Sequence, residues 1–178
     1  MTISQNPLAS SSWVSAARRK ELIVGVGDMQ VSSDVSTRLV TYSLGSCVGI
    51  TIYDPVAKVG GLLHAMLPDS AINKERAASR PFMFVDTGLQ AMFLEVYSLG
   101  GVKARMQVKV CGGAEFLDEK MFFNIGQRNL DVTFATLARN HVQIAARETG
   151  GSDSRTIRLD LTNGELTVDT AGRKPHQI

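Results

Sequence analysis

The chain has 178 residues, of which 44% are hydrophobic and 20% charged, so it is long enough to bury the core of one ordinary soluble domain. Its net charge of +2 gives no indication of nucleic-acid binding, and no apolar run approaches the roughly 20 residues that a membrane-embedded helix needs. The N-terminus lacks a basic segment followed by an apolar one, so we expect no secretory signal and, with only two cysteines, a reducing cytoplasmic location.

We expect one domain over residues 21–170, preceded by a flexible Ser-rich tail over residues 1–20 and followed by a C-terminal tail over residues 171–178. Alternating and β-branched apolar residues in the first half predict strands at residues 21–32, 37–42, 47–53 and 60–67. The polar residues 68–81 then predict a long loop, which is either functional or mobile.

Two helices are expected in the second half of the domain. The first covers residues 85–101, with Asp86 as its N-cap and two glycines at its end. Its apolar residues recur at helical spacing, at Leu89, Met92, Phe93 and Val96. The second helix begins near Asn129, which we expect to be its N-cap rather than a residue that serves a site.

Further strands are predicted at residues 104–110, 142–148, 156–161 and 166–168. The last two form a hairpin, because the pair Asn163-Gly164 favours a type I′ turn. These strands and the two helices, in this order, predict a single-domain α+β layered sandwich rather than a doubly wound parallel sheet.

A cysteine and a histidine are expected to meet on the first of these hairpins. If Pro55 and Val56 form the centre of its turn, Cys47 lies directly opposite His64, with Cβ atoms about 4.5–5.5 Å apart. Nearby glycines should leave open space beside the pair. A longer turn would shift the pairing, and a shift by one residue would separate the two side chains.

This pair has the residue types of a cysteine nucleophile and its base. An imidazolium beside the thiol would favour the thiolate, and the imidazole could later protonate a departing amine. Backbone N–H groups in the bend at Gly45 and Ser46 could face an oxyanion. The alternative stays open at this point, since Cys47 could equally be a small buried hydrophobe and His64 a hydrogen-bonded core residue.

The second cysteine, Cys111, ends a strand without a histidine at a predictable distance, so we interpret it as structural. A disulfide with Cys47 is conceivable, but the expected compartment argues against it. The cysteines and histidines do not have the spacing of a zinc site, so no metal is expected.

Several motifs resemble the CheD family of chemoreceptor glutamine deamidases, in family order over about residues 22–168. They are TYSLGSCVGITIYDP, GGLLHAMLP, VCGGAEF, NIGQRN and the pattern GG-x-x-x-R at residues 150–155. The resemblance implies that Cys47 is the nucleophile, that His64 is the base and that Thr41 orients the imidazole. It also implies a fold related to bacterial toxin cysteine deamidases and a reaction that needs no cofactor or metal.

The implied reaction is hydrolysis of a glutamine side-chain amide in the cytoplasmic helical domain of a chemoreceptor, with backbone donors near Gly45 and Ser46. A long helical substrate suggests a shallow groove, and residues 68–81 either contact the receptor or are merely solvated. The resemblance also implies a side activity, the hydrolysis of receptor methyl esters.

Two other classes of function remain. The resemblance implies that the chain could be a regulatory binding module that partners a CheC-type response-regulator phosphatase. A thiol redox protein is a weaker hypothesis, since the chain has no C-x-x-C pair.

Overall fold

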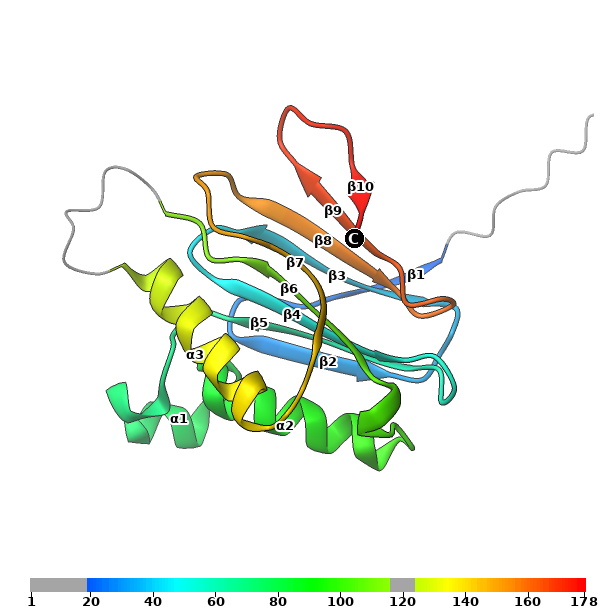
Figure 1. Ribbon diagram of the computed structural model, residues 1–178, viewed down its shortest axis with the longest axis horizontal. Helices are drawn as coiled ribbons and strands as arrows, with labels where there is room; N and C mark the ends of the chain where they lie inside the picture. The colour runs from blue at the N-terminus through cyan, green and yellow to red at the C-terminus, as the bar shows by residue number, and fades with distance from the viewer. Residues whose placement is uncertain (1–18, 116–123) are drawn as a thin grey trace, which may run out of the picture.

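The structure is a computed structural model that describes residues 19–115 and 124–178. Two five-stranded sheets stack face to face, and two long helices cover the outer face of one of them (Figure 1). The predicted α+β layered sandwich is therefore confirmed. The residues expected as a flexible N-terminal tail lie almost entirely outside the described part of the chain.

The first sheet contains, in spatial order, β1 (Lys20–Ile23), β3 (Thr37–Leu44), β8 (Arg155–Asp160), β9 (Leu166–Thr170) and β10 (His176–Gln177). The second contains β2 (Asp28–Ser32), β5 (Val59–Ala65), β4 (Val48–Asp54), β6 (Gln107–Gly112) and β7 (Ile144–Thr149). Both sheets are mixed, because β1 pairs with β3 and β6 pairs with β7 in parallel while the other pairs are antiparallel. The strand predicted over residues 21–32 is in fact two strands, one in each sheet.

The second sheet separates two cores, because alternate side chains of a strand point to opposite faces. Val48, Ile50 and Ile52 of β4 pack toward the helices. Tyr53 of β4 and Leu62 of β5 pack toward the first sheet. Every strand residue of β4 and β5 is buried, so these two strands form the centre of the molecule.

The helices are α1 (Lys74–Ser79), α2 (Val85–Ser98) and α3 (Ile125–Arg139), with short 3-10 turns η1 (Ser70–Ile72), η2 (Pro81–Met83) and η3 (Lys103–Arg105). The expected apolar face of α2 is confirmed, since Leu89, Met92 and Val96 are buried against the second sheet. The segment 68–81 was expected to be a loop, but η1 and α1 occupy most of it.

Both predicted N-caps are wrong. The helix α2 begins at Val85, and the carboxylate of Asp86 instead accepts hydrogen bonds from the Ser70 N–H and hydroxyl. The helix α3 begins four residues earlier than expected, and the side chain of Asn124 caps it by accepting from the Gln127 N–H at 3.0 Å. Asn129 therefore lies within α3, where it is fully buried.

The turn between β4 and β5 is longer than predicted. Asp54 pairs with Val59, and the Lys58 N–H donates to the Asp54 carbonyl across a four-residue loop in which Lys58 has a φ of 55°. The pairing is therefore displaced by two residues, so that Gly49, rather than Cys47, lies opposite His64. A displacement by two keeps every side chain on its predicted face, whereas a displacement by one would have reversed them all.

The C-terminal region extends the first sheet. The predicted hairpin of β8 and β9 is present, but its loop is longer than a type I′ turn, since the Asp160 N–H donates to the Glu165 carbonyl and only Gly164 has a positive φ. The segment expected as a C-terminal tail contains β10, and the Ile178 N–H donates to the Leu166 carbonyl at 3.0 Å. Among the described residues, no helix has the length and apolar character of a membrane span.

Candidate active site

Thr41 and His64 meet between the two sheets. The Thr41 Oγ1 lies 2.7 Å from the His64 Nδ1 and 2.7 Å from the Val24 carbonyl oxygen. Thr41 comes from β3 in the first sheet and His64 from β5 in the second, and both are buried, with exposed fractions of 0% and 1%. The structure thus brings together two of the three residues for which the sequence predicts a catalytic role.

The surrounding backbone fixes both side chains. The His64 carbonyl accepts from the Gly27 N–H at 2.8 Å, and β5 is paired on both sides, by β2 and β4. After Thr41 the pairing of β3 with β8 becomes irregular, and Ser43 adopts a φ of 57°. A non-glycine residue in this left-handed region is uncommon. Here it precedes the loop that crosses from the first sheet to the second.

The hydrogen bonds of Thr41 determine the state of the imidazole. A carbonyl oxygen can only accept, so the single hydroxyl proton of Thr41 must point to Val24. The Thr41 oxygen then accepts from the His64 Nδ1, which must carry the ring proton. The Nε2 therefore presents a lone pair, and it is buried without a hydrogen-bond partner among the described residues. A neutral imidazole in this tautomer is a base that can accept a proton at Nε2.

Cys47 lies in the crossing loop between β3 and β4, half-buried and packed against the inter-sheet core. It precedes Gly49 by two residues, so it occupies a diagonal rather than a directly opposite position relative to His64. Diagonal neighbours in a regular sheet are about 7–8 Å apart at Cα. Accordingly, no hydrogen bond joins the thiol to the imidazole among the contacts of the described residues.

The glycines around the pair do not leave the predicted open space. A Cβ on Gly49 would lie 2.6 Å from the Leu44 Cδ1, and one on Gly60 would lie 2.4 Å from the Leu161 Cδ2. Side chains of Leu44 in β3 and of Leu161, which follows β8, already fill these positions. The glycines instead allow the two sheets to pack closely beside the site.

Burial sets the charge of both groups. It lowers the pKa of His64 from 6.5 to about 4, and it raises the pKa of Cys47 from 9.0, although the N–H of Cys47 itself opposes that increase. The free protein near pH 7 therefore holds a neutral imidazole and a protonated thiol. The expectation of an imidazolium beside a thiolate is wrong for this state, because both charged forms would lose hydration in the inter-sheet core.

Three successive carbonyl groups of the crossing loop are held from one side. The Gly45 carbonyl accepts from the Ala114 N–H at 2.8 Å, and the Cys47 carbonyl accepts from the Gly113 N–H at 2.8 Å. Between them, the Ser46 carbonyl accepts from the Asn129 Nδ2 at 2.9 Å. The loop is thereby fixed to the end of β6 and to α3.

These anchors determine where the loop's N–H groups point. In a trans peptide the N–H is directed opposite to the preceding C=O, and the described residues contain no cis peptide bond. The N–H of Ser46 therefore points away from Ala114, and the N–H of Cys47 points away from Asn129 of α3. The sequence predicts oxyanion donors near Gly45 and Ser46. Each of these residues supplies the carbonyl of a peptide unit whose N–H belongs to the next residue, so the candidate donors are the N–H groups of Ser46 and Cys47.

The sequence pattern does not indicate the importance of Asn129, because it predicts that α3 begins at this residue, whereas α3 begins at Ile125. Once α3 begins at Ile125, Asn129 falls on the same buried stripe as Leu130, Thr133 and Leu137. A buried amide on an otherwise apolar stripe requires hydrogen-bond partners, and this is the signal that could have identified it.

Cys111 has the environment of a structural residue. It is fully buried, and burial, with Glu148 nearby, raises its pKa to about 12. Both cysteines are free thiols. Among the described residues, no cluster of three or more histidine, cysteine, aspartate or glutamate side chains could hold a metal ion.

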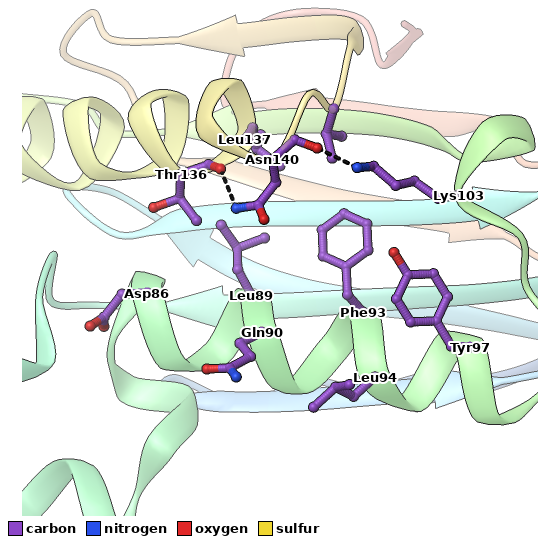
Figure 2. Close-up of a pocket in the computed structure, with 11 residues that line it drawn as sticks. Asp86, Leu89, Gln90, Phe93, Leu94, Tyr97, Lys103, Thr136, Leu137 and Asn140 are labelled. Atoms are coloured by element: carbon purple, nitrogen blue, oxygen red, sulfur yellow. Dashed lines mark hydrogen bonds between the residues drawn. The ribbon is translucent and has the colours of Figure 1, made fainter.

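A separate cavity of about 340 Å³ opens between α2 and α3 (Figure 2). Phe93 and Tyr97 of α2 face it from one side and Asn140 from the other, with Lys103 at its edge. The helix-facing core of the second sheet separates this cavity from His64, which points to the opposite face. It is therefore not the site described above.

Comparison with known proteins points to one family. The model of the CheD family, described as CheD chemotactic sensory transduction, matches residues 66–170. The chain is 46% identical over 152 residues to "Probable chemoreceptor glutamine deamidase CheD 1" of Syntrophus aciditrophicus, covering 85% of this chain and 95% of that protein. It is 44% identical over 151 residues to the protein named "Probable chemoreceptor glutamine deamidase CheD" in Pyrococcus horikoshii, covering 84% of this chain and 91% of the other.

The family model begins two residues after His64, but a match over 152 residues of a 178-residue chain cannot omit residues 41–64. Among solved structures, the crystal structure of Neisseria meningitidis protein NMB0706, family model DUF152, has a TM-score of 0.42 at 9% identity, covering 75% of this chain and 63% of that chain. A similarity at that level does not bear on function.

Proposed function

The chain belongs to the CheD family, and we propose that it is a protein-glutamine glutaminase that converts glutamine side chains of a chemoreceptor to glutamate. The activity named for its relatives supports the substrate class. The observation that carries the chemistry is the hydrogen bond from the His64 Nδ1 to the Thr41 oxygen, which leaves the Nε2 as a base near the Cys47 loop. Cys47, His64 and Thr41 are the proposed catalytic set.

In the first half of the reaction, the Cys47 sulfur attacks the carboxamide carbon, and the thiol proton passes to the His64 Nε2. Substrate binding and rotation of the Cys47 side chain would close the diagonal gap, as active-site hydrogen bonds often shorten only in the complex. A C–S bond forms, and the carbonyl oxygen becomes an oxyanion. The N–H groups of Ser46 and Cys47 are its proposed donors.

The tetrahedral species then collapses. The C–N bond breaks, the His64 Nε2 returns the proton to the leaving nitrogen, and ammonia departs from a thioester on Cys47. The neutral imidazole next takes a proton from water as the water attacks the thioester. Glutamate is released and the thiol recovers its proton. The Thr41 oxygen stabilises the imidazolium that forms in each half, because it accepts from the Nδ1 throughout.

A receptor fragment tests this proposal. We expect the protein to release ammonia from a chemoreceptor cytoplasmic fragment and to shift the mass of particular glutamine-containing peptides to that of glutamate. The Cys47→Ala variant should do neither, while the Cys111→Ala variant should retain the activity. Receptor glutamines left unchanged by the wild-type protein would contradict the proposal.

The same acyl chemistry extends to receptor methyl esters, with methanol in place of ammonia as the leaving group. Supplying the fragment with methylated glutamates and measuring methanol release tests this activity. Release of ammonia and release of methanol should both depend on Cys47, because both reactions pass through the same thioester intermediate.

A second proposed role, binding of a CheC-type phosphatase, rests on the family resemblance alone. The Cys47→Ala variant separates the two roles, since it should bind the phosphatase but leave receptor glutamines unaltered. We also propose a cytoplasmic location, where the receptor's helical domain is accessible. The segment that contains α1 leaves the end of the His64 strand and is the proposed receptor contact.

A further inference from the structure

Asn129 is a buried polar residue that links the two halves of the proposed site. Its Nδ2 donates to the Ser46 carbonyl at 2.9 Å and to the Met66 carbonyl at 3.2 Å. Ser46 immediately precedes Cys47, and Met66 follows His64 by two residues. One amide group thus contacts both the nucleophile loop and the end of the strand that carries the base.

The orientation of this amide is unambiguous. Two carbonyl oxygens face the same terminal atom, and a carbonyl can only accept, so that atom must be the nitrogen with its two N–H donors. A flipped amide would place three oxygens together. Asn129 is fully buried, which removes water as a competing partner for the two bonds.

The surroundings hold Asn129 rigidly. Its position in α3 is fixed by Gly126, whose α-carbon lies so close to the end of β6 that a Cβ would be 2.6 Å from the Ala114 carbonyl oxygen. The Thr133 hydroxyl donates to the Asn129 carbonyl at 2.7 Å. The side chain therefore has a fixed base from which to reach the loop.

We propose that Asn129 is a positioning residue, which holds the Ser46–Cys47 peptide so that the Cys47 N–H faces the oxygen of an acyl group under attack. The inference rests on the proposed role of Cys47 as nucleophile. Since the peptide is trans, fixing the Ser46 oxygen toward α3 fixes the Cys47 N–H in the opposite direction. Without Asn129, the neighbouring anchors from Gly113 and Ala114 would leave this central peptide free to rotate.

Two reagents separate this role from a merely structural one. In acetylation by p-nitrophenyl acetate, the Cys47 sulfur attacks a carbonyl carbon, an oxyanion develops, and p-nitrophenolate leaves. In alkylation by iodoacetamide, the sulfur displaces iodide and no oxyanion forms. Both rates depend on access and on the thiolate fraction, so their ratio, measured on the Cys47 peptide by mass spectrometry, isolates stabilisation of the oxyanion.

For Asn129→Leu, which keeps most of the volume and removes both donors, we expect acetylation to slow about 100-fold while alkylation changes by less than about threefold. Thr136→Val, a change in the same helix at a hydroxyl that has no hydrogen-bond partner among the described residues, should leave the ratio unchanged. If Asn129→Leu does not fold, Asn129→Ser has a side chain too short to reach both carbonyls and should lower the ratio in the same direction.

An unchanged ratio in the folded Asn129 variants would overturn the inference, whether both rates fall together or neither falls. The receptor assay distinguishes this failure from that of the proposed function. A lowered ratio beside unaltered receptor glutamines would reject the substrate and keep the role of Asn129. If the wild type deamidates the receptor but the ratio is unchanged in the Asn129 variants, the proposed function is kept and the role of Asn129 is rejected.

Discussion

Thr41 and His64 belong to different sheets, and the 2.7 Å contact between their Oγ1 and Nδ1 atoms crosses the core between the sheets. The Val24 carbonyl, in the connection between β1 and β2, completes this chain of hydrogen bonds by accepting from the Thr41 hydroxyl. Sheet packing and the state of the imidazole are thus linked, since the imidazole keeps its tautomer only while the sheets keep their separation.

Replacing Thr41 should therefore affect catalysis more than folding. Thr41→Val preserves the shape of the side chain but removes the acceptor of the Nδ1 proton, so the imidazole can rotate or change tautomer. We expect kcat for receptor deamidation to fall on the order of 100-fold. Thr41→Ser, which keeps the hydroxyl, should retain most of the activity.

Thr37 provides a matched control, because it is fully buried in the same strand four residues earlier. Thr37→Val should leave kcat within about twofold of the wild type. Equal losses in the Thr37 and Thr41 variants would mean that β3 matters only for packing.

The low pKa of His64 predicts a particular loss of stability in acid. The imidazole binds a proton near pH 6.5 in the unfolded chain and near pH 4 in the folded protein. As pH falls from 6.5 to 4, the unfolded state binds the proton first, so His64 contributes stability above pH 6.5 that is lost by about pH 4. The gap between the two pKa values corresponds to about 3 kcal/mol.

Urea unfolding between pH 4 and 7 measures this contribution. Carboxylates also titrate in this range, so the comparison is with His64→Gln. Between pH 7 and pH 4, the free energy of unfolding should fall by about 3 kcal/mol less in this variant than in the wild type. Identical slopes in the wild type and His64→Gln would show that His64 titrates normally.

Sequence patterns predicted the layers, most strands and the apolar face of α2, because burial of alternating or helically spaced side chains is a local signal. They also placed Cys47 and His64 on one face. The observed pairing of β4 with β5 differs from the predicted one by two residues, because the turn after Asp54 has four residues and places Lys58 in a left-handed conformation. A lysine in the sequence gives no indication of that conformation.

The contacts made between distant segments could not be predicted in the same way. Val24 reaches Thr41 through sheet pairing, and Asn129 reaches Ser46 from a helix 83 residues away in sequence. The predicted imidazolium at His64 was also wrong, because the pKa of His64 depends on how completely the two sheets exclude water from it. These properties arise from tertiary packing rather than from any single segment.

The two thiols should differ in reactivity because of access. Cys47 is half-buried, whereas Cys111 is fully buried with a pKa of about 12, so iodoacetamide should modify Cys47 first. Burial also raises the pKa of Cys47, so its thiolate remains a minor species near pH 7. The alkylation rate should accordingly rise about tenfold for each pH unit between 7 and 8.

Peptide mapping after timed alkylation of the native protein measures both properties. Denatured protein is the control, because both cysteines should then react at similar rates. An alkylation rate at Cys47 that no longer changes with pH below pH 7 would indicate a thiolate paired with an imidazolium. That result would contradict the raised pKa of Cys47 and the lowered pKa of His64.

For the replacement of Gly126 by alanine, helix propensity and packing predict opposite effects on stability. In an isolated helix, alanine is favoured over glycine by about 1 kcal/mol, so propensity alone predicts that Gly126→Ala stabilises the protein. In the structure, a Cβ at this position would lie 2.6 Å from the Ala114 oxygen and 2.9 Å from the Gly113 oxygen. These are backbone atoms that cannot rotate away as a side chain can.

We expect packing to prevail, with the free energy of unfolding lowered by about 1–3 kcal/mol in chemical denaturation. Gly25→Ala is the control, since a Cβ there would lie 4.0 Å from its nearest neighbour, the Asp28 Cβ, and the effect should stay within about 0.5 kcal/mol. Displacing the first turn of α3 would also draw Asn129 from the Ser46 carbonyl, so Gly126→Ala should slow acetylation of Cys47 more than its alkylation. A stabilised Gly126→Ala variant with normal acetylation would mean that α3 can move away from β6 without disturbing the loop.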